Sequence, residues 1–431
     1  MTEKQDAGCG YINDYCQQRH RSVVRCEWTA TKGRILRSSR SFKQGEIIFR
    51  EPPLHIVSEQ TGHRETFERV KELCKKRPQA FVFEPLWYWA ALCSLKPDQV
   101  PKDSHLEAVS EDTQKKLLLL YSMEVSAPSE ASKVLAHEFR LERCCEPLCL
   151  ERLLQVWILN CFEHTDDPLG YSTYFMSSFM SHSCYPNAVW TYDGDDFILR
   201  AREKIEVDEE ITVSYLGEES MLDAASFRRK HLRDSKHFLC CCIRCSSDSD
   251  PCRGFRCPSC SNASLRLGAC QEQVEVGAET MTFRKCEHCG HALSFGEAAV
   301  LIGEETLLKE KVEEMEGATS PDKELIQRLS KSLRRAEKSL EQHCLLDRSY
   351  QLMADLHERF AHCQEAEKYM RKRLRYQAKA YPGISGCVAW TAEAYADMLM
   401  KHAGASLDPV TACHSAERIE CCKTVRLGAF R

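Results

Sequence analysis

FMSHSCYPNAVW at residues 179–190 is the segment from which the fold of this chain can be predicted. In this segment Ser-His-Ser-Cys is followed by Tyr and then Pro-Asn. A second segment, EVDEEITVSYL at 206–216, has an acidic strand pattern that ends in tyrosine. Asp193-Gly194-Asp195 separates two apolar runs, which is typical of a hairpin turn. Strands are therefore predicted at 188–191, 197–202 and 210–216.

The composition is that of an ordinary globular protein with an unusual number of cysteines. The chain has 431 residues, 43% of them hydrophobic, and a net charge of −5, so two or three domains are expected and no positive field favours nucleic acid. The polar start lacks the apolar core of a signal peptide, and the longest aliphatic run, Leu117–Leu120, is too short to cross a membrane.

The 26 cysteines indicate zinc ligands and buried thiols of a reducing compartment. We expect a cytoplasmic protein, with nuclear and cytoskeletal association left open.

The order of the predicted elements indicates that a helical segment interrupts a β-rich domain. Two short strands joined by the turn Lys43-Gln44-Gly45 are predicted from Arg34 onward, with a stop at Pro52-Pro53. Apolar residues then recur at helical spacing, which predicts helices at 66–76, 85–95, 113–123 and 146–160. Because strand patterns return at residue 188, the predicted fold class is α+β with a helical insert at about 62–158.

One group of cysteines has the spacing of a zinc ribbon. Cys257 and Cys260 form one C-x2-C pair, and Cys286 and Cys289 form another. Two such pairs that face each other across a hairpin supply four thiolates for one zinc ion. The alternative ligands are Cys252 and His291. The segment lacks a basic patch, so a structural spacer is favoured over nucleic-acid binding.

After Cys289 only helical patterns are found. They predict helices at 297–316, 321–343, 347–361, 363–380 and 388–402. Helix pairs of this length indicate an all-α, tetratricopeptide-like domain, although no clean repeat is visible. The predicted domains are an N-terminal extension (1–26), the split β-rich domain (27–239), a short cysteine-rich segment (240–250), the zinc-ribbon-like segment (251–296) and the helical domain (297–431).

The two quoted segments and the cysteines at 240–245 together resemble the signature motifs of SET-domain protein lysine methyltransferases. A split SET domain followed by helices is similar to the SMYD group of that family. The resemblance implies an enzyme that uses S-adenosylmethionine to methylate a lysine of a protein substrate. In SET domains the segment matching Ser181–Cys184 is threaded through a loop formed by the segment matching Glu210–Tyr215, and this knot holds the cofactor and the lysine channel.

The resemblance assigns roles to individual residues. Tyr215 would place its hydroxyl beside the transferring methyl group and the incoming amine, which makes it the candidate catalytic residue. Ser181 and His182 would hold the adenine end of the cofactor, and Asn160 its methionine part. The other candidate cofactor-binding residues are Lys32, Gly33 and Arg34 in an N-terminal turn, and Phe238 against the adenine or the channel wall. The structural alternatives are a helix C-cap for Asn160 and an ordinary core position for Phe238.

Two residues depart from the family pattern. Ser181 stands where the family usually has asparagine, and Asp208 where it usually has glycine before the paired acids. Neither change removes the reactive geometry, but both weaken the expected contacts to the cofactor. The alternative functions are therefore a catalytically weak SET-fold scaffold that recruits partners through its helical domain and, less favoured by the acidic balance, a zinc-dependent nucleic-acid binder.

The resemblance also implies a post-SET zinc site. Cys240, Cys242 and Cys245 form C-x-C-x2-C, and Cys184 of the signature would supply the fourth thiolate, which leaves Cys241 as a bystander. Four cysteines around zinc form a closed structural site, so this metal would order the segment rather than react.

SMYD proteins usually carry a MYND zinc finger inside the split. Between Pro53 and Cys144 this chain has only Cys74 and Cys93, so the finger is predicted to be missing. A further N-terminal metal site is left open by the irregularly spaced Cys9, Cys16, His20 and Cys26. A homodimer is the oligomeric state expected from the resemblance.

Overall fold

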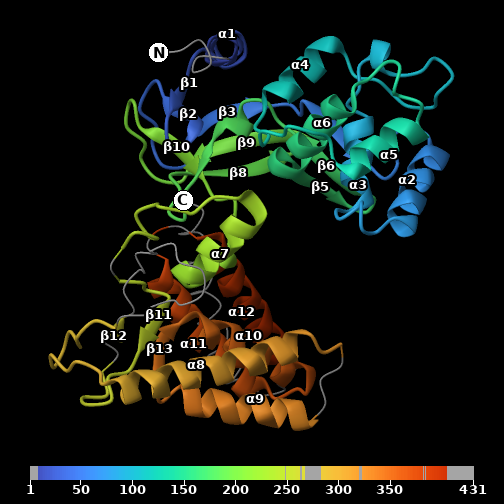
Figure 1. Cartoon of the computed structure of the whole chain (residues 1–431). Coiled ribbons are helices and arrows are strands. Elements are labelled where there is room, and N and C mark those ends of the chain that lie inside the picture. The colour runs from blue at the N-terminus through green and yellow to red at the C-terminus, as the bar shows by residue number, and fades with distance from the viewer. Residues whose placement is uncertain are drawn as a thin grey trace. The chain divides into compact units, whose positions relative to one another are not determined.

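The chain divides into two compact units (Figure 1). The computed structural model describes residues 8–247, 249–262, 265–266, 283–319, 323–381, 383 and 385–404. Unit 1 comprises Met1–His182 and Pro186–Val213, and unit 2 comprises Ser183–Tyr185 and Ser214–Arg431. Each unit has its own cluster of buried apolar side chains. Each of the two quoted segments contributes residues to both units.

The described strands of unit 1 form three sheets. The first has the order β1-β2-β10-β7, with β1 (Val24–Thr29), β2 (Gly33–Ser38), β10 (Glu210–Val213) and β7 (Ser181–His182). The second has the order β3-β9-β8, with β3 (Ile47–Glu51), β9 (Asp196–Ala201) and β8 (Ala188–Asp193). The third has the order β4-β6-β5, with β4 (His55–Ser58), β6 (Leu169–Thr173) and β5 (Phe162–Asp166).

A helical segment lies between strands that pair with each other, so the prediction of a split β-rich domain is confirmed. Strand β4 precedes the helices and β6 follows them, yet the two pair antiparallel from His55↔Thr173 to Ser58↔Gly170. The intervening elements are α2 (Arg64–Lys76), α3 (Pro85–Leu92), η1 (Pro97–Gln99), α4 (Glu111–Leu119), α5 (Glu130–Glu138) and α6 (Pro147–Asn160). Helix α5 was not predicted. Buried apolar residues of α3 and α6 form the centre of this segment, where Trp157 Nε1 donates to Ser94 Oγ at 2.8 Å.

The N-terminal residues, predicted as an extension, pack into the core of unit 1 and pair with its first sheet. Helix α1 (Cys9–His20) buries Ile12 and Cys16, and β1 pairs antiparallel with β2 along its whole length. The boundary predicted at residues 26/27 therefore falls inside β1. Val24 and Cys26 are the buried alternate residues of that strand, a period-2 pattern too short to stand out beside the polar residues around it.

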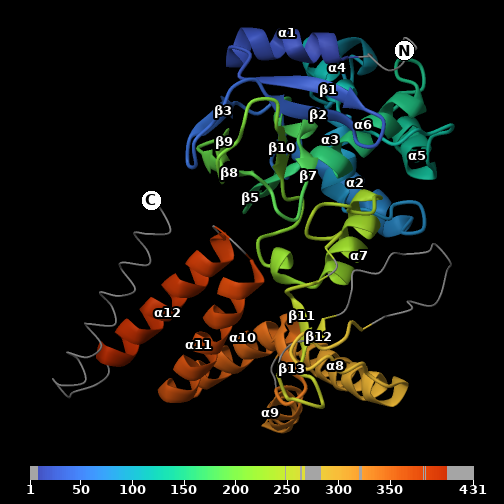
Figure 2. The same ribbon diagram turned by 90° about the vertical axis from the view of Figure 1, so that its left-hand side faces the viewer.

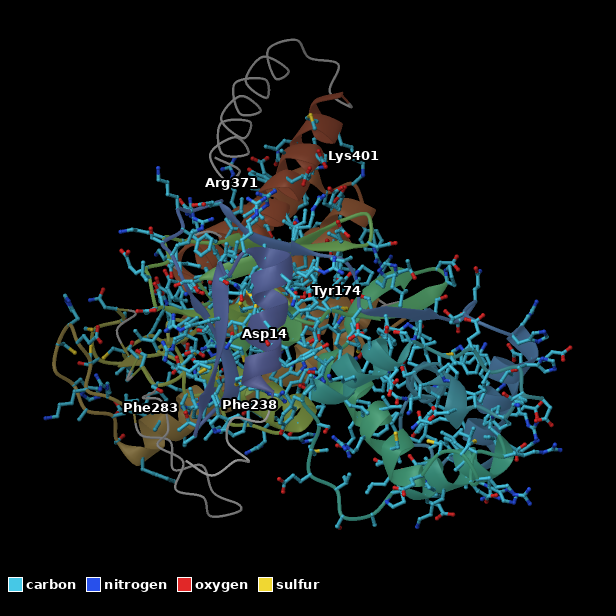
Figure 3. The ribbon with its side chains drawn as sticks, turned by 90° about the horizontal axis from the view of Figure 1, so that it is seen from above. Asp14, Tyr174, Phe238, Phe283, Arg371 and Lys401 are labelled. Carbon is cyan, nitrogen blue, oxygen red and sulfur yellow. The ribbon has the colours of Figure 1, made fainter. Side chains whose placement is uncertain are left out.

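Unit 2 contains a small sheet and a series of helices (Figure 2). The sheet has the order β12-β11-β13, with β12 (Leu265–Arg266), β11 (Arg253–Phe255) and β13 (Leu340–His343). The helical elements are η3 (Ser220–Leu222), α7 (Ala225–Lys236), α8 (Phe295–Glu316), α9 (Lys323–Ala336), α10 (Cys344–Arg359), α11 (Cys363–Ala380) and α12 (Gly386–Gly404). Helix α10 packs against α11 and α11 against α12. Between the latter two, Arg371 Nε donates to Tyr395 Oη at 2.8 Å (Arg371 is labelled in Figure 3).

The prediction that no strand follows Cys289 is wrong. The helix predicted to run to residue 343 ends at Ala336, and Leu340–His343 pair with β11 as the third strand of the sheet. Leu340 and His343 are both buried in this pairing. A strand of four residues directly before a long helix carries too little alternation to be separated from the helical pattern. The predicted helix start at 320–322 lies outside the described residues.

No helix in the described part of the chain combines the length and the apolar character needed to span a membrane.

A buried ion cluster joins the sheet of unit 2 to α8. Glu305 Oε1 accepts from Arg253 Nε at 2.7 Å and lies 3.0 Å from His343 Nε2, and its Oε2 accepts from Arg253 Nη2 at 2.8 Å. Burial alone would raise the pKa of Glu305, but the hydrogen bonds and charges of His343 and Arg253 lower it to about 2. The ionised carboxylate is therefore the form that stabilises the folded state.

Replacing Glu305 with glutamine is expected to destabilise unit 2 by about 3–5 kcal/mol at pH 7, because Arg253 would be left buried without its counter-charge. Since the folded pKa lies below the unfolded value, this stabilisation is present above that unfolded value and is lost as the pH falls toward 2. The difference between wild type and variant should therefore shrink in acid. Hydrogen exchange of α8 measures it, with Glu313→Gln, on the exposed side of the same helix, as the control. Equal effects of the two substitutions would contradict this account.

Candidate functional site

The two quoted segments meet in unit 1 as a parallel strand pair. Strand β7 lies beside β10 with Ser181 opposite Thr212 and His182 opposite Val213. Such a pairing places the Ser-His segment along the acidic strand, as the resemblance implies. Strand β7 has two residues and no local strand signal, so only the motif could have predicted it.

Asn187 fastens the two segments together. Its Nδ2 donates to the Glu210 carbonyl at 2.8 Å, and its Oδ1 accepts from the Thr212 backbone N–H at 2.9 Å. The side chain is 5% exposed, so these bonds form away from water. The Pro-Asn pair at 186–187 belongs to the quoted segment, but no role of the asparagine was predicted from it.

Glu210 connects two of the predicted cofactor-binding residues. Both of its carboxylate oxygens lie 2.8 Å from Lys32 Nζ, and Oε1 also accepts from Ser181 Oγ. Lys32 is partly exposed, so the ion pair itself contributes little to stability, but it fixes where both side chains lie. Glu210 was predicted only as part of the acidic strand, because its partners are far away in the sequence.

Arg34 contacts a different residue from Lys32. Its guanidinium carbon is 5.2 Å from the centre of the Phe179 ring, a cation–π arrangement, and burial lowers the pKa of Arg34. Gly33, between them, has φ +71°, a left-handed conformation that glycine adopts without strain. The Lys32-Gly33-Arg34 turn therefore sends its two cations to Glu210 and to Phe179.

Asp208 has a physical reason to stand where the family has glycine. Its φ is +66°, in the left-handed region, which aspartate tolerates better than most residues. Its carboxylate also contacts Arg25 Nη1 at 2.5 Å. The departure is therefore accommodated by the local backbone.

Asn160 ends α6 and is held by backbone carbonyls. Its Nδ2 donates to Val156 O and to Tyr121 O, both at 2.8 Å, and the side chain is 8% exposed. The C-cap of α6 is the next residue, Cys161, whereas the Asn160 side chain bonds a carbonyl of the last helical turn. A contact with a cofactor amine would fall to the Oδ1 atom.

In unit 2, Tyr215 and Phe238 pack together. Their ring centres are 6.3 Å apart at an interplanar angle of 88°, an edge-to-face arrangement (Phe238 is labelled in Figure 3). Tyr215 is 42% exposed, so its ring is accessible from solvent. The structure thus brings together the predicted catalytic tyrosine and the predicted aromatic wall.

Unit 2 contains a cluster of four cysteine side chains, from Cys184, Cys240, Cys242 and Cys245. All four sulfur atoms lie within 4.8 Å of one another, with Cys184 Sγ 3.5 Å from Cys245 Sγ. Hydrogen bonds from the Cys184 thiol lower the pKa of Cys242 below its usual range and that of Cys245 to about 7. The donor set fits a structural zinc ion, which thiolates bind. Cys241 is exposed and outside the cluster, as predicted.

Cys257, Cys260, Cys286 and Cys289 form the second cluster predicted from sequence, again with all sulfurs within 4.8 Å. Each C-x2-C pair closes the same kind of turn. Ser261 N–H donates to Cys257 O and Gly290 N–H donates to Cys286 O, both at 2.8 Å, and both donors have positive φ. The repeated geometry fits one zinc ion held by two knuckles. Most of the connecting segment lies outside the described residues.

The two residues considered as alternative ligands of the second cluster make other contacts. His291 Nε2 is 3.0 Å from Glu297 Oε1, and Cys252 is buried against Arg244. The open N-terminal site is not formed either, because Cys16 Sγ donates to Val24 O while Cys9 Sγ and Cys26 Sγ form a pair 3.8 Å apart. Among the described residues, the two four-cysteine sets are the clusters able to hold a metal ion.

Two buried arginines flank the first cluster and were missed by the sequence analysis. Arg228 is 1% exposed, and its Nη2 lies 3.7 Å from Cys245 Sγ. Arg244 is 9% exposed and donates from Nη1 to Cys184 O at 2.9 Å and from Nη2 to Ala380 O at 3.2 Å. Zinc with four thiolates carries two negative charges, which these two guanidinium groups can balance. Arg228 is in a basic helix that reads as a solvated surface, so no local signal identified it.

The sequence matches the family model of the SET domain over residues 33–216. Histone-lysine N-methyltransferase SMYD3 of mouse is 42% identical over 79 residues, 18% of this chain and 18% of that protein. N-lysine methyltransferase SMYD2-B of Xenopus laevis is 34% identical over 111 residues, 25% of each chain. These relatives are therefore matched over about a quarter of their length or less.

Solved SET-domain structures are more distant. The SET domain of LSMT bound to lysine and AdoHcy is 10% identical with a TM-score of 0.32, covering 98% of this chain and 91% of the other. Rubisco LSMT bound to AdoMet is 11% identical with a TM-score of 0.29, covering 87% and 94%. The sequence match is the stronger finding: residues 33–216 match the SET-domain model, the two segments that β7 and β10 bring together lie within that range, and over the matched lengths the chain is similar to SMYD proteins.

Proposed function

We propose that this chain is a protein-lysine N-methyltransferase that transfers the methyl group of S-adenosylmethionine to the lysine amine of a protein substrate. The observation that carries the proposal is the parallel pairing of β7 with β10, which joins the two signature segments within the SET domain. Tyr215 follows β10 by two residues.

The proposed reaction is an in-line displacement at a sulfonium methyl, which depends chiefly on positioning. The amine must be neutral to attack, and deprotonating a free lysine at pH 7 costs about 4–5 kcal/mol. An aromatic surface with little water disfavours the ammonium form and lowers that cost. We assign this surface to Tyr215 and Phe238, with the Tyr215 hydroxyl oriented toward the methyl group and the amine.

The cofactor side is assigned to Ser181, His182 and Asn160, and to the turn Lys32-Gly33-Arg34. These residues offer hydroxyl, imidazole, carboxamide and cationic groups, a donor set that fits the ribose, adenine and amino-acid parts of S-adenosylmethionine. When bound, the cofactor supplies the electrophilic methyl group. In this assignment Ser181 acts together with Glu210, whose carboxylate already accepts its hydroxyl, in place of the asparagine usual in the family.

The finer parts of the proposal concern the rest of the molecule. The two zinc ions are assigned a structural role, and the helices from α8 to α12 a tetratricopeptide-like role in holding partner proteins. We further propose that the chain lacks a MYND finger, forms a homodimer and acts in the cytoplasm, with nuclear or cytoskeletal association.

The test is to incubate the zinc-loaded protein with methyl-labelled S-adenosylmethionine and a whole-cell lysate, beside the Tyr215→Phe variant. The proposal expects label on specific protein bands that the variant does not produce. A wild-type protein that binds zinc and the cofactor but transfers no label would contradict the enzyme and favour the scaffold.

A further inference from the structure

One buried guanidinium group in unit 2 contacts backbone or sulfur atoms at four other positions of the chain. Arg244 is 9% exposed, and its Nη1 donates to Cys184 O and to Met221 O, both at 2.9 Å. Its Nη2 donates to Ala380 O at 3.2 Å and lies 3.5 Å from Cys252 Sγ. Each terminal nitrogen carries two hydrogens, so these contacts account for all of them.

The Nη1 atom joins the two quoted segments inside unit 2. Cys184 belongs to the first segment, and Met221 lies six residues after Tyr215, which belongs to the second. Residues 214–222, the tyrosine segment, are turned back on themselves, because Met221 N–H donates to Gly217 O at 3.2 Å. A nitrogen that fixes the Met221 carbonyl therefore restricts where the backbone of Tyr215 lies.

Further contacts fasten the tyrosine segment to the ends of α11 and α12. Ala380, which accepts from the guanidinium group, is the last residue of α11. Tyr376 Oη, one turn earlier in that helix, donates to Leu222 O at 2.7 Å. Glu218 Oε2 accepts at 3.0 Å from the N–H of Gly386, the first residue of α12. The helices therefore hold the tyrosine segment by backbone and side-chain hydrogen bonds.

These contacts need the shape of an arginine side chain and not only its charge. A guanidinium presents donors on two terminal nitrogens in one plane, whereas a lysine ammonium is a single point. The ring of Tyr381 lies against this plane, with its centre 5.1 Å from the guanidinium carbon. Arg244 also directly precedes the candidate zinc ligand Cys245, where either cation can balance thiolate charge. A lysine at this position therefore separates the two roles.

We propose that Arg244 is a positioning residue for methyl transfer, which holds the tyrosine segment where the Tyr215 hydroxyl meets the methyl group and the amine. Its bond to Ala380 O makes the end of α11 part of the same support. The helical domain then orders the catalytic residue in addition to holding partner proteins. The inference rests on the proposed methyl transfer, and it adds to that function the residue that sets the geometry of Tyr215.

The first test compares Arg244→Lys with wild type as zinc-loaded, full-length protein, using methyl-labelled S-adenosylmethionine and the lysate bands that wild type labels. Losing the fork should lower the single-turnover rate at saturating cofactor about 10- to 100-fold, the cost of a small misplacement at a reaction centre. The cofactor concentration for half-maximal rate should change less than about threefold, because the loss falls on the reaction step. Both zinc sites should stay filled. A variant that transfers label at the wild-type rate would overturn the proposal.

Arg253→Lys is the matched control for the loss of a buried fork in the same unit. Arg253 bonds Glu305 through Nε at 2.7 Å and Nη2 at 2.8 Å, which joins β11 to α8. Both variants are compared at a temperature at which hydrogen exchange shows unit 2 to be folded. Arg253→Lys should keep the wild-type rate. An equal loss in the two variants would show that general destabilisation, and not the position of Tyr215, lowers the rate.

Combining Arg244→Lys with Tyr215→Phe tests whether the effect depends on the tyrosine hydroxyl. In the Tyr215→Phe background, Arg244→Lys should lower the rate by less than about threefold, because the group that it orients is already missing. The same fold loss in both backgrounds would contradict a positioning role.

Tyr376→Phe keeps the inference testable if Arg244→Lys loses zinc or fails to fold. The variant keeps its ring in the core and removes the hydroxyl that bonds Leu222 O. It should lower the rate about 3- to 10-fold while both zinc sites stay filled, because one support of the tyrosine segment is lost. A wild-type rate for Tyr376→Phe would then overturn the proposal. A wild-type protein that transfers no label contradicts the proposed function instead, so the two failures are distinct.

Discussion

Replacing Tyr215 with phenylalanine is expected to lower the rate of methyl transfer about 100- to 1,000-fold, the range found when one oriented hydrogen-bond donor is removed from a reaction centre. The variant keeps the ring, and the ring is what packs edge-to-face on Phe238. The fold of unit 2 and its zinc content should therefore be unchanged. Single-turnover transfer of labelled methyl groups with saturating cofactor measures the effect on the reaction step.

Tyr192→Phe is the matched control for this prediction. Tyr192 lies on β8, within the residues that match the SET-domain model, and its hydroxyl donates to Glu163 O at 2.9 Å. Removing that bond should change stability by about 1 kcal/mol and leave methyl transfer unaltered. Equal rates for wild type and Tyr215→Phe would show that the hydroxyl has no part in the reaction.

Loss of one ligand of the first cluster is expected to have the largest effect on stability. Cys240→Ser should reduce bound zinc from two ions per chain to one, because a closed site needs all four thiolates. Zinc binding in such modules contributes on the order of 10 kcal/mol, so segments 183–185 and 240–252 should lose protection from hydrogen exchange. Arg228 and Arg244 increase the effect, since they would remain buried beside thiols that carry less negative charge.

Cys241→Ser is the control that separates zinc binding from a general sensitivity of this segment. Cys241 is adjacent to two ligands in sequence, but it is exposed and its sulfur lies near Leu239 O instead of the cluster. Two zinc ions per chain should remain, with hydrogen exchange as in wild type. If Cys240→Ser also retained two ions, the four-cysteine assignment would be incorrect.

The sequence was sufficient for those parts of the molecule whose signal is local or whose residue types are chemically specific. The hairpin of β8 and β9 follows from the turn Asp193-Gly194-Asp195 and the apolar runs beside it. The second cysteine cluster follows from spacing alone, and the first from the resemblance to the post-SET site, which adds Cys184 to the C-x-C-x2-C run. Long amphipathic helices such as α11 were predicted with their observed bounds, because many residues contribute to a helical period.

The missed features depend on partners that are distant in the chain. Strand β13 is a strand only because β11 lies beside it, and Glu210 is a connecting residue only because Lys32 and Ser181 reach it. Arg228 reads as one of several surface cations until the thiols beside it are known. The positive φ of Asp208 likewise depends on the conformation of the surrounding backbone, which cannot be read from one sequence.

The central claim is tested most directly by the chemical identity of the methylated product. Protein labelled by the wild-type chain and methyl-labelled S-adenosylmethionine is hydrolysed to amino acids, and the radioactive fraction is compared with standards. The account predicts that the label elutes with methylated lysine and is absent from the Tyr215→Phe reaction. Label in methylarginine or as a base-labile ester, or no transfer by a protein with both zinc sites filled, would contradict it.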